Sequence, residues 1–364
     1  MKKELLDFLE CPNCRCRPTL ECFEQGNNLK NSSPAANGEV VFGILHCDCG
    51  TLYPIIDGVP RFLNGGVGSF PDFLSRFQHE IEHLGNIRQP EVTNSTLVSE
   101  NDYDNIRRSF SQEWGLFDYD GDKTWGWTLE ERKKVFLDDV SMKPKELSGK
   151  RLLDAGCGNG TLTAALSDFN LEIVGLDLND GLGRAWQNRD KYAAKAIRQV
   201  QYIQGNLVDP PLKDHSFDVV YSSGVIHHTP SSKDAFDSLV RLTTRGGRLY
   251  VWVYGKRSFP VRLFFLCGRG LKRWMSLRSL LGVCRTLAPI YKVAAESLDR
   301  SGLIKFRLRT AREITLDLFD AFAPRYNFWH TQAEVRSWFV QSGFGNINVS
   351  GMQKHGFGMY GDKI

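Results

Sequence analysis

Six of the nine cysteines in this 364-residue chain fall within its first 49 residues, and four of them form the two close pairs CPNC and CDC. Disulfide-stabilised secreted proteins spread their cysteines through the fold, whereas a cluster at one end indicates a metal site. Two thiolate pairs on tight turns suit a closed, tetrahedral structural zinc. The predicted ligands are Cys11, Cys14, Cys47 and Cys49. The second pair is shorter than the usual C-x-x-C, so Cys16 and Cys22 stay as alternative ligands.

A second chemical pattern is the glycine-rich sequence LLDAGCGNG at residues 152–160. Gly156, Gly158 and Gly160 follow an apolar stretch and precede a helical one. Glycine is needed at such a turn for its unusual backbone angles and for the close approach of a ligand to the backbone. Asp177 ends the next apolar stretch, where a carboxylate can accept both ribose hydroxyls of an adenosine. A nicotinamide-binding fingerprint reads GxGxxG instead, so the pattern favours a different nucleoside cofactor.

Alternating strands and helices must position these residues. Short apolar stretches predict five strands, at 151–154, 172–177, 200–203, 217–221 and 247–254. A helix near 331–342 and two final strands, at 346–349 and 356–360, complete the pattern. Thr128 with Glu131 three residues later is typical of a helix N-terminus. Such alternation predicts an α/β fold, with a parallel sheet covered by helices on both faces.

Further segments appear in a fixed order after the glycine turn, and each is quoted as it stands in the chain. They are VGLDL at 174–178, GNL at 205–207, FDVVYSSGVIHH at 217–228 and RGGRL at 245–249. Together they resemble the class I S-adenosylmethionine-dependent methyltransferases of the methyltransferase type 11 group, over about residues 149–254. The resemblance implies a Rossmann-like, seven-stranded methyltransferase sheet. It is specific for fold and cofactor and says little about the substrate.

The resemblance also implies cofactor-binding roles, position by position. Asp154 and Gly156 would line the methionine end of the cofactor, and Asp177 would bind the ribose. Gly158 and Gly160 would lie in the turn beside the adenosyl group. Asn206, followed by Leu207, stands where the family usually has Asp to meet the adenine amino group, and Ser222 would end the fourth strand beside the methyl group.

His227 and His228 directly follow the fourth expected strand. Methyl transfer to a hydroxyl or an acidic carbon requires removal of a proton, and imidazole titrates near neutral pH. Both histidines are therefore predicted as candidate catalytic bases, against the alternative that one of them only packs structurally. His330 and His355 are further candidates.

The acceptor is expected to be a small molecule in a biosynthetic pathway, with O- or C-methylation ahead of N-methylation. The Asn/Asp-Pro-Pro-Tyr/Phe motif of enzymes that methylate nucleobase amines is absent where the fourth strand ends. The alternative is an RNA methyltransferase whose zinc ribbon binds the substrate. Against it, residues 1–64 hold 6 Lys or Arg and 8 Asp or Glu, a poor surface for phosphate.

These patterns divide the chain into three parts. Residues 1–64 form a zinc-ribbon module, which resembles the small zinc proteins that activate tRNA and translation-factor methyltransferases. Residues 65–148 form a flexible Gly-rich linker followed by an aromatic cover segment, which includes Phe110, Trp114, Phe117, Tyr119, Trp125 and Trp127. Residues 149–364 form the methyltransferase domain, with a helical insertion at about 256–325.

The insertion is the most basic part of a chain whose net charge is only +4. Residues 256–320 hold 14 Lys or Arg and 5 Asp or Glu, mixed with leucines and aromatic residues. A solvated helical cap or a substrate lid is expected there, with peripheral contact to an anionic membrane as an alternative. No apolar run approaches the ~18 residues of a membrane span, and no secretory signal is visible. A soluble, cytoplasmic protein with reduced thiols is therefore expected.

Overall fold

The computed structural model describes residues 1–26, 38–84, 100–116, 127–192, 200–256, 266, 268–270, 274–300, 310–353 and 355–364. Three residues of the expected aromatic cover, Phe117, Tyr119 and Trp125, lie outside this set. So do parts of the basic insertion.

Five parallel strands form the centre of the sheet, close to where the sequence predicts them. They are β5 (Arg151–Ala155), β6 (Glu172–Asp177), β7 (Val200–Gly205), β8 (Phe217–Ser223) and β9 (Thr243–Tyr254). β11 (Gly356–Lys363) pairs antiparallel with β9 and with β10 (Phe344–Gln353). The order is β7-β6-β5-β8-β9-β11-β10, so chain order reverses between β5 and β8. In open α/β sheets, ligands bind at the carboxyl ends of strands beside such a switch point.

Helices cover both faces of this sheet because alternate residues of each strand point to opposite sides. On one face, Leu152 and Tyr221 pack in a buried cluster with Phe136 of α4 (Leu129–Val140) and Trp186 of α7 (Leu182–Tyr192). The short α6 (Thr161–Ala165) lies on the same face. On the other, Leu153 packs with α8 (Ser232–Leu242) and α12 (Gln332–Gln341). The predicted α/β architecture is confirmed. The capping box predicted at Thr128 is also present at the start of α4.

The expected sheet of seven strands is only part of the sheet that forms. Four N-terminal strands, β1 (Thr19–Gln25), β2 (Val40–His46), β3 (Leu52–Ile56) and β4 (Val59–Phe62), extend it to eleven. They follow one another antiparallel, and β4 then pairs in parallel with β7. The sequence prediction missed this pairing because the free edge of β7 has no signature of its own. Backbone groups on an edge strand favour the addition of another strand.

Buried polar contacts reinforce this junction. The guanidinium of Arg189 on α7 lies 2.9 Å from the carboxylate of Glu39, and both side chains are almost fully buried. Arg61 of β4 donates to Gln204 of β7. The glycine-rich segment expected as a flexible linker instead forms a short 3-10 helix, η4 (Gly66–Ser69), followed by α1 (Pro71–Arg76) and α2 (Gln78–His83).

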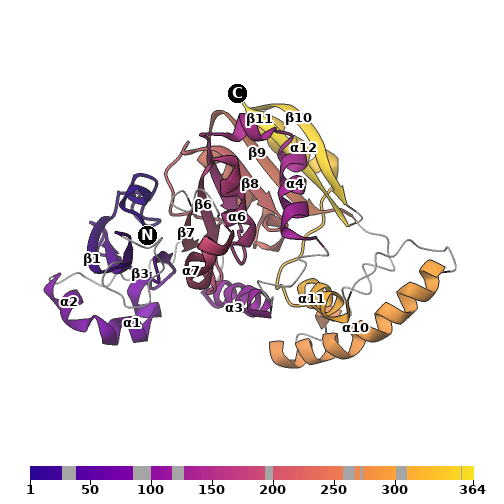
Figure 1. Cartoon of the computed structure of the whole chain (residues 1–364), viewed down its shortest axis with the longest axis horizontal. Helices are drawn as coiled ribbons and strands as arrows, with labels where there is room; N and C mark the ends of the chain where they lie inside the picture. The colour runs from indigo at the N-terminus through magenta and orange to yellow at the C-terminus, as the bar shows by residue number, and fades with distance from the viewer. Residues whose placement is uncertain are drawn as a thin grey trace.

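Helices α3 (Glu100–Leu116), α10 (Leu277–Arg300) and α11 (Ala311–Phe322) lie outside the two covering layers, on the side of the glycine turn (Figure 1). α3 contacts α11, and α11 packs along the long α10 at the periphery of the molecule. The described part of the basic insertion is thus helical, as predicted. Among the described helices, none combines the length and the apolar character needed to cross a membrane.

Candidate active site

The glycine turn connects β5 to α6 at the carboxyl edge of the parallel strands. Gly156, Gly158 and Gly160 have φ values of 90°, 58° and 72°, which side chains other than glycine rarely adopt. A Cβ at Gly158 would collide with the indole ring of Trp114 from α3. The turn therefore forms a backbone cradle without side chains of its own at these positions, and the Trp114 ring packs directly on it.

Two predicted carboxylates flank this turn. Asp154 accepts a hydrogen bond from the Thr163 hydroxyl at 2.6 Å, and burial raises its pKa to about 6. Asp177 accepts backbone N–H groups from Gly158 at 2.8 Å and from Asn179 at 2.9 Å. Burial raises the pKa of Asp177 as well. Each oxygen of Asp177 thus accepts one of these N–H groups, Oδ2 from Gly158 and Oδ1 from Asn179.

Three other predicted cofactor residues are placed differently. Asn206 lies at the carboxyl end of β7, where its side-chain oxygen accepts the Val208 N–H at 3.0 Å. Leu207 is buried in the hydrophobic core. The fully buried Ser222 donates its hydroxyl to the Ala155 carbonyl at 2.9 Å and so links β8 to β5. Of the three, Asn206 is in contact with the covering helix, through the Tyr103 hydroxyl.

The two candidate bases occupy distinct environments in the 3-10 helix η7 (Ile226–His228). His227 is fully buried, with its ring centroid 4.2 Å from that of Tyr254. His228 has Nδ1 at 3.0 Å from the Tyr326 carbonyl, and a carbonyl can only accept. Nδ1 therefore carries the proton, and Nε2 presents a lone pair. Burial lowers the pKa of His228 to about 4, so this lone pair stays available at neutral pH.

His330 is bound on both ring nitrogens. Nδ1 lies 3.0 Å from a Glu334 carboxylate oxygen, and Nε2 lies 3.0 Å from the Ser232 hydroxyl. With both nitrogens engaged, this side chain fixes the start of α12 to α8.

Helix α3 brings the predicted residues together. Its Ser111 hydroxyl and Arg107 guanidinium both donate to Asp180, which follows β6 by three residues. The Asp180 N–H in turn donates to the Ser111 oxygen at 2.9 Å. Phe110 places its ring 5.7 Å from that of His228. The cover predicted from the aromatic segment thus contacts the glycine turn, the loop after β6 and the candidate base.

A buried carboxyl from α3 was missed at the sequence level. Glu113 is 2% exposed, and within the described residues its Oε2 has no hydrogen-bond partner. Burial, with Asp320 and Asp177 nearby, raises its pKa well above the usual value. Asp320 of α11 accepts the Tyr254 hydroxyl at 3.1 Å, and burial raises its pKa to about 6. This gathering of acids would stabilise a ligand that carries positive charge.

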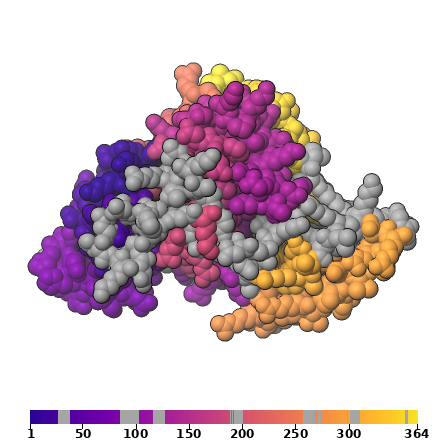
Figure 2. All heavy atoms as spheres, in the orientation of Figure 1, coloured from indigo at the N-terminus to yellow at the C-terminus, as the bar shows by residue number. Residues whose placement is uncertain are grey.

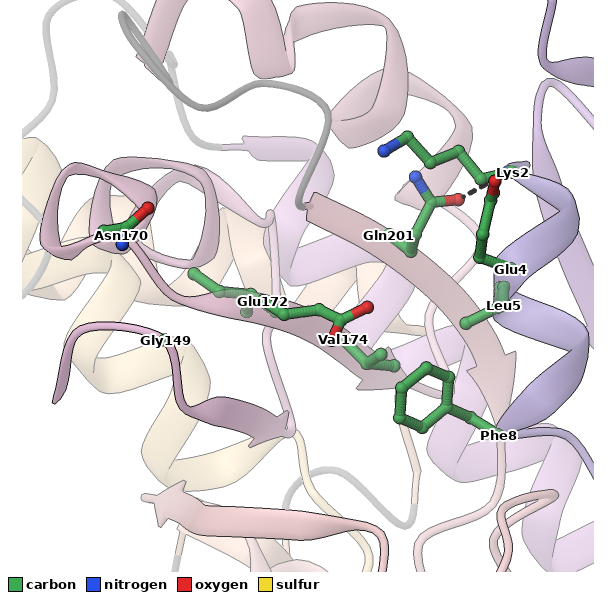
Figure 3. Close-up of a pocket in the computed structure, with 10 residues that line it drawn as sticks. Lys2, Glu4, Leu5, Phe8, Gly149, Asn170, Glu172, Val174 and Gln201 are labelled. Carbon is green, nitrogen blue, oxygen red and sulfur yellow. Dashed lines mark hydrogen bonds between the residues drawn. The ribbon is translucent and has the colours of Figure 1, made fainter.

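A hollow of about 370 Å³ lies elsewhere, between the N-terminal segment and the sheet (Figure 3). Lys2 and Phe8 line it from the N-terminal segment, and Glu172 and Gln201 line it from the sheet, where the Gln201 side chain accepts the Lys2 N–H. Glu172 and Gln201 begin β6 and β7, so this hollow is at the amino edge of the parallel strands. It is at the opposite edge from the glycine turn and is separate from the candidate cofactor site.

The two cysteine pairs meet in the N-terminal module. The four predicted sulfur atoms, from Cys11, Cys14, Cys47 and Cys49, all lie within 4.8 Å of one another. The Cys14–Cys47 and Cys11–Cys49 distances are 3.1 and 3.7 Å. In a tetrahedral site with Zn–S bonds of about 2.3 Å, sulfur atoms lie about 3.8 Å apart. The donor set therefore fits zinc, whereas the alternative ligands Cys16 and Cys22 are exposed and outside this group.

Comparison with known proteins agrees with the site. Residues 153–251 match the family model described as a methyltransferase domain. Among curated relatives, a demethylmenaquinone methyltransferase of Clavibacter sepedonicus is 26% identical over 155 residues, which are 42% of this chain and 60% of that protein. A ubiquinone/menaquinone biosynthesis C-methyltransferase of Ectopseudomonas mendocina is 32% identical over 117 residues, 31% of this chain and 45% of that protein.

Solved structures are matched more weakly. The magnesium protoporphyrin IX methyltransferase of Synechocystis PCC 6803 with bound S-adenosylmethionine has 16% identity and a TM-score of 0.43, over 75% of this chain and all of that one. A TM-score this low adds nothing to the fold seen in the strand order. The strand order, the glycine turn and the family match define residues 153–251 as a methyltransferase domain of the S-adenosylmethionine-dependent class.

Proposed function

We propose that this protein transfers the methyl group of S-adenosylmethionine to an oxygen or carbon of a small-molecule acceptor in a biosynthetic pathway. The observation that carries the proposal is the cradle at the carboxyl edge, where the glycine turn, Asp154 and Asp177 lie beneath α3. The chain spans 60% and 45% of the lengths of the two relatives described above, so the activity of the whole protein is inferred from this site.

The residues present fit that cofactor, which when bound supplies a methyl group on a positively charged sulfonium. Asp177 would accept the ribose hydroxyls, and the backbone of Gly156 and Gly158 would border the rest of the molecule. The buried carboxyls Asp154 and Glu113 would favour its positive charge. Trp114 and Phe110 on α3 would exclude water from the reacting groups, which matters because displacement depends on positioning.

His228 is the better of the two candidate bases. Its Nε2 lone pair can accept the acceptor's proton, while the Tyr326 carbonyl holds the ring in one tautomer. His227 is fully buried among the rings of Tyr254, Trp252 and His228, which suits a packing role. The aromatic surroundings favour an apolar acceptor. Relatives named for a quinone, a sterol and a rifamycin point in the same direction.

Calorimetry with S-adenosylhomocysteine tests the cofactor site. Asp177→Ala should weaken binding about 100-fold, because two hydrogen bonds to a charged group are lost at about 1.5 kcal/mol each. Asp177→Asn keeps the shape of the side chain and checks that the loop still folds. The control is Asp237→Ala, an exposed carboxylate on α8 that pairs with Lys233. Equal affinity in Asp177→Ala and in the control would rule out this site.

We also propose that the N-terminal module, within the predicted boundaries 1–64, binds one structural zinc through Cys11, Cys14, Cys47 and Cys49. Metal analysis of the purified protein should give about one zinc per chain. Cys47→Ser should lose the metal and lower the melting temperature, because the ion crosslinks the two turns. Cys16→Ser and Cys22→Ser are matched controls that should keep it. A wild-type protein without zinc would contradict the proposal.

The RNA methyltransferase alternative makes a separate prediction. Bulk RNA should then bind at low salt, with an affinity that falls steeply as salt rises. We expect little binding, because the module carries more acidic than basic residues.

Expression with a fluorescent tag would test the proposed cytoplasmic location.

A further inference from the structure

Helix α10 has two apolar faces, and only one is packed. Leu280, Leu281, Cys284 and Ala288 are buried against α11, where Phe319 completes a small core. A surface helix of a globular protein normally needs one such face and exposes polar residues elsewhere. α10 departs from this rule, because further large apolar side chains along it are exposed.

The second face is an exposed stripe of apolar side chains, here called the α10 stripe: Leu287, Ile290, Tyr291 and Val293. Their exposed fractions are 40%, 63%, 50% and 64%. Leu287, Ile290 and Tyr291 have the i, i+3, i+4 spacing that places residues side by side on a helix. At the N-terminal end, Trp274 is 87% exposed. Exposed large apolar residues gathered on one element mark an interaction surface.

A row of cationic side chains on α10 lies away from most of this stripe. Arg278, Arg285 and Lys292 are seven residues apart and so form one row along the helix. With 100° per residue, this row lies about 140–180° around the axis from Leu287. Lys292 pairs with Glu296 on the same side. By the same angles Val293 lies about 60–100° from this row and close to Arg300. Leu287, Ile290 and Tyr291 can therefore enter an apolar medium while the long cationic side chains beside Val293 reach the headgroups.

Cationic sequence flanks the helix at both ends. Residues 256–278 contain seven Lys or Arg and no Asp or Glu, and residues 300–309 contain four and none. An apolar helical face with cations at both ends is complementary to a bilayer surface with anionic headgroups. Trp274 suits the same boundary, since tryptophan prefers the interface between headgroups and hydrocarbon. A second protein copy would meet its own cations across a symmetric contact, which disfavours self-association.

We propose that the α10 stripe docks this protein on an anionic membrane surface. Figure 2 shows α10 along the outer rim of the molecule, where a flat surface can reach it. α11 lies between this helix and the candidate active site: Phe319 packs on α10, and Asp320 lies close to Glu113 of α3. Docking would then place the active site beside the bilayer. This last point rests on the proposed function, and it identifies the acceptor as a membrane-resident apolar molecule.

Co-sedimentation of the full-length protein with vesicles tests the docking. Vesicles of phosphatidylcholine with 30% phosphatidylglycerol should bind the protein at 0.1 M NaCl, and phosphatidylcholine alone should bind at least fivefold less. The double variant Ile290→Glu/Val293→Glu should lose at least tenfold in binding. Its matched control is Val340→Glu, which changes an apolar residue of α12 that is 59% exposed.

Three results would overturn the proposal: no binding of the wild-type protein, equal binding of the double variant, or equal loss in Val340→Glu. Light scattering that gives a dimer which the double variant breaks, without vesicle binding, would assign the stripe to a second copy instead. Calorimetry with S-adenosylhomocysteine should be unchanged in the double variant. Loss of vesicle binding with intact cofactor binding therefore separates this proposal from the proposed function.

Discussion

Helices α3 and α10 both lie outside the two layers that cover the sheet, yet they use their surfaces in opposite ways. α3 contacts four parts of the candidate site, through Tyr103, Ser111, Phe110 and Trp114. α10 packs mainly on α11 in the described structure and leaves further large apolar side chains exposed.

These two helices outside the covering layers therefore differ in what their side chains do. Polar side chains of α3 make specific hydrogen bonds to the loop after β6, so a change in one residue should alter ligand binding. The exposed side chains of α10 make few specific contacts, so single changes there should leave cofactor binding intact. Four pairs of variants test whether α3 and α10 differ in this way.

The largest effect is expected at His228, under Phe110 of α3. Removal of a general base costs typically 10²–10⁴-fold in rate, so His228→Gln should lower kcat at least about 100-fold. Since burial lowers the pKa of His228 to about 4, the rate should stay constant through pH 6–7. It should fall only as pH approaches that value. The control is His330→Gln, whose ring nitrogens are both engaged outside the site. A fall in rate centred near pH 6.5 would contradict the assignment of His228 as the catalytic base.

Glycine substitutions test the packing of the two helices. Gly158→Ala places a Cβ at φ 58° and against the Trp114 ring, which should weaken S-adenosylhomocysteine at least about tenfold. Gly282 in α10 has open space around it, so Gly282→Ala should leave affinity unchanged. It should also raise the free energy of unfolding by about 0.5–1 kcal/mol. Calorimetry and urea denaturation measure both quantities. If Gly158→Ala and Gly282→Ala bind S-adenosylhomocysteine equally well, α3 and α10 do not differ in their contact with the cofactor site.

The Glu113 carboxyl of α3 should give the affinity for a cationic ligand a different pH dependence from the affinity for a neutral one. Burial raises the pKa of Glu113 well above its usual value, and a sulfonium beside the carboxyl would favour its ionised form. Binding of S-adenosylmethionine should therefore release a proton. Its affinity should rise between pH 6 and pH 8 by about fivefold more than the affinity for S-adenosylhomocysteine. Glu113→Gln should abolish this difference, while Glu296→Gln in α10 should retain it. Calorimetry at pH 6 and 8 decides the outcome.

The sequence predicted the five central parallel strands and the two C-terminal strands, because most of them are apolar runs bounded by clear turn signals. It also predicted that four distant thiols meet, since paired cysteines leave few other arrangements. Pairing of β4 with β7 could not be predicted, because backbone hydrogen bonds between strand edges leave no residue-specific trace.

The surroundings of individual side chains could be predicted less well from the sequence. Ser222 was expected beside the methyl group, but its hydroxyl is used by the Ala155 carbonyl. Two adjacent histidines looked equivalent until the Tyr326 carbonyl distinguished them. Glu113 reads as an ordinary helical acid, and only the approach of α11 to α3 makes it a buried one. Such contacts depend on tertiary packing between distant segments, 67 residues apart for Ser222 and Ala155 and 98 for His228 and Tyr326.

The smallest effect is expected from two serines. Ser111 of α3 exchanges two hydrogen bonds with Asp180, whereas Ser297 of α10 donates to the Val293 carbonyl of its own helix. At about 0.5–1 kcal/mol for the two exposed hydrogen bonds together, Ser111→Ala should weaken S-adenosylhomocysteine about threefold. It should also speed proteolysis within α3. Ser297→Ala loses a bond that competes with the helix backbone, so affinity should stay unchanged. A threefold loss in both variants would mean that α10, too, is coupled to the cofactor site.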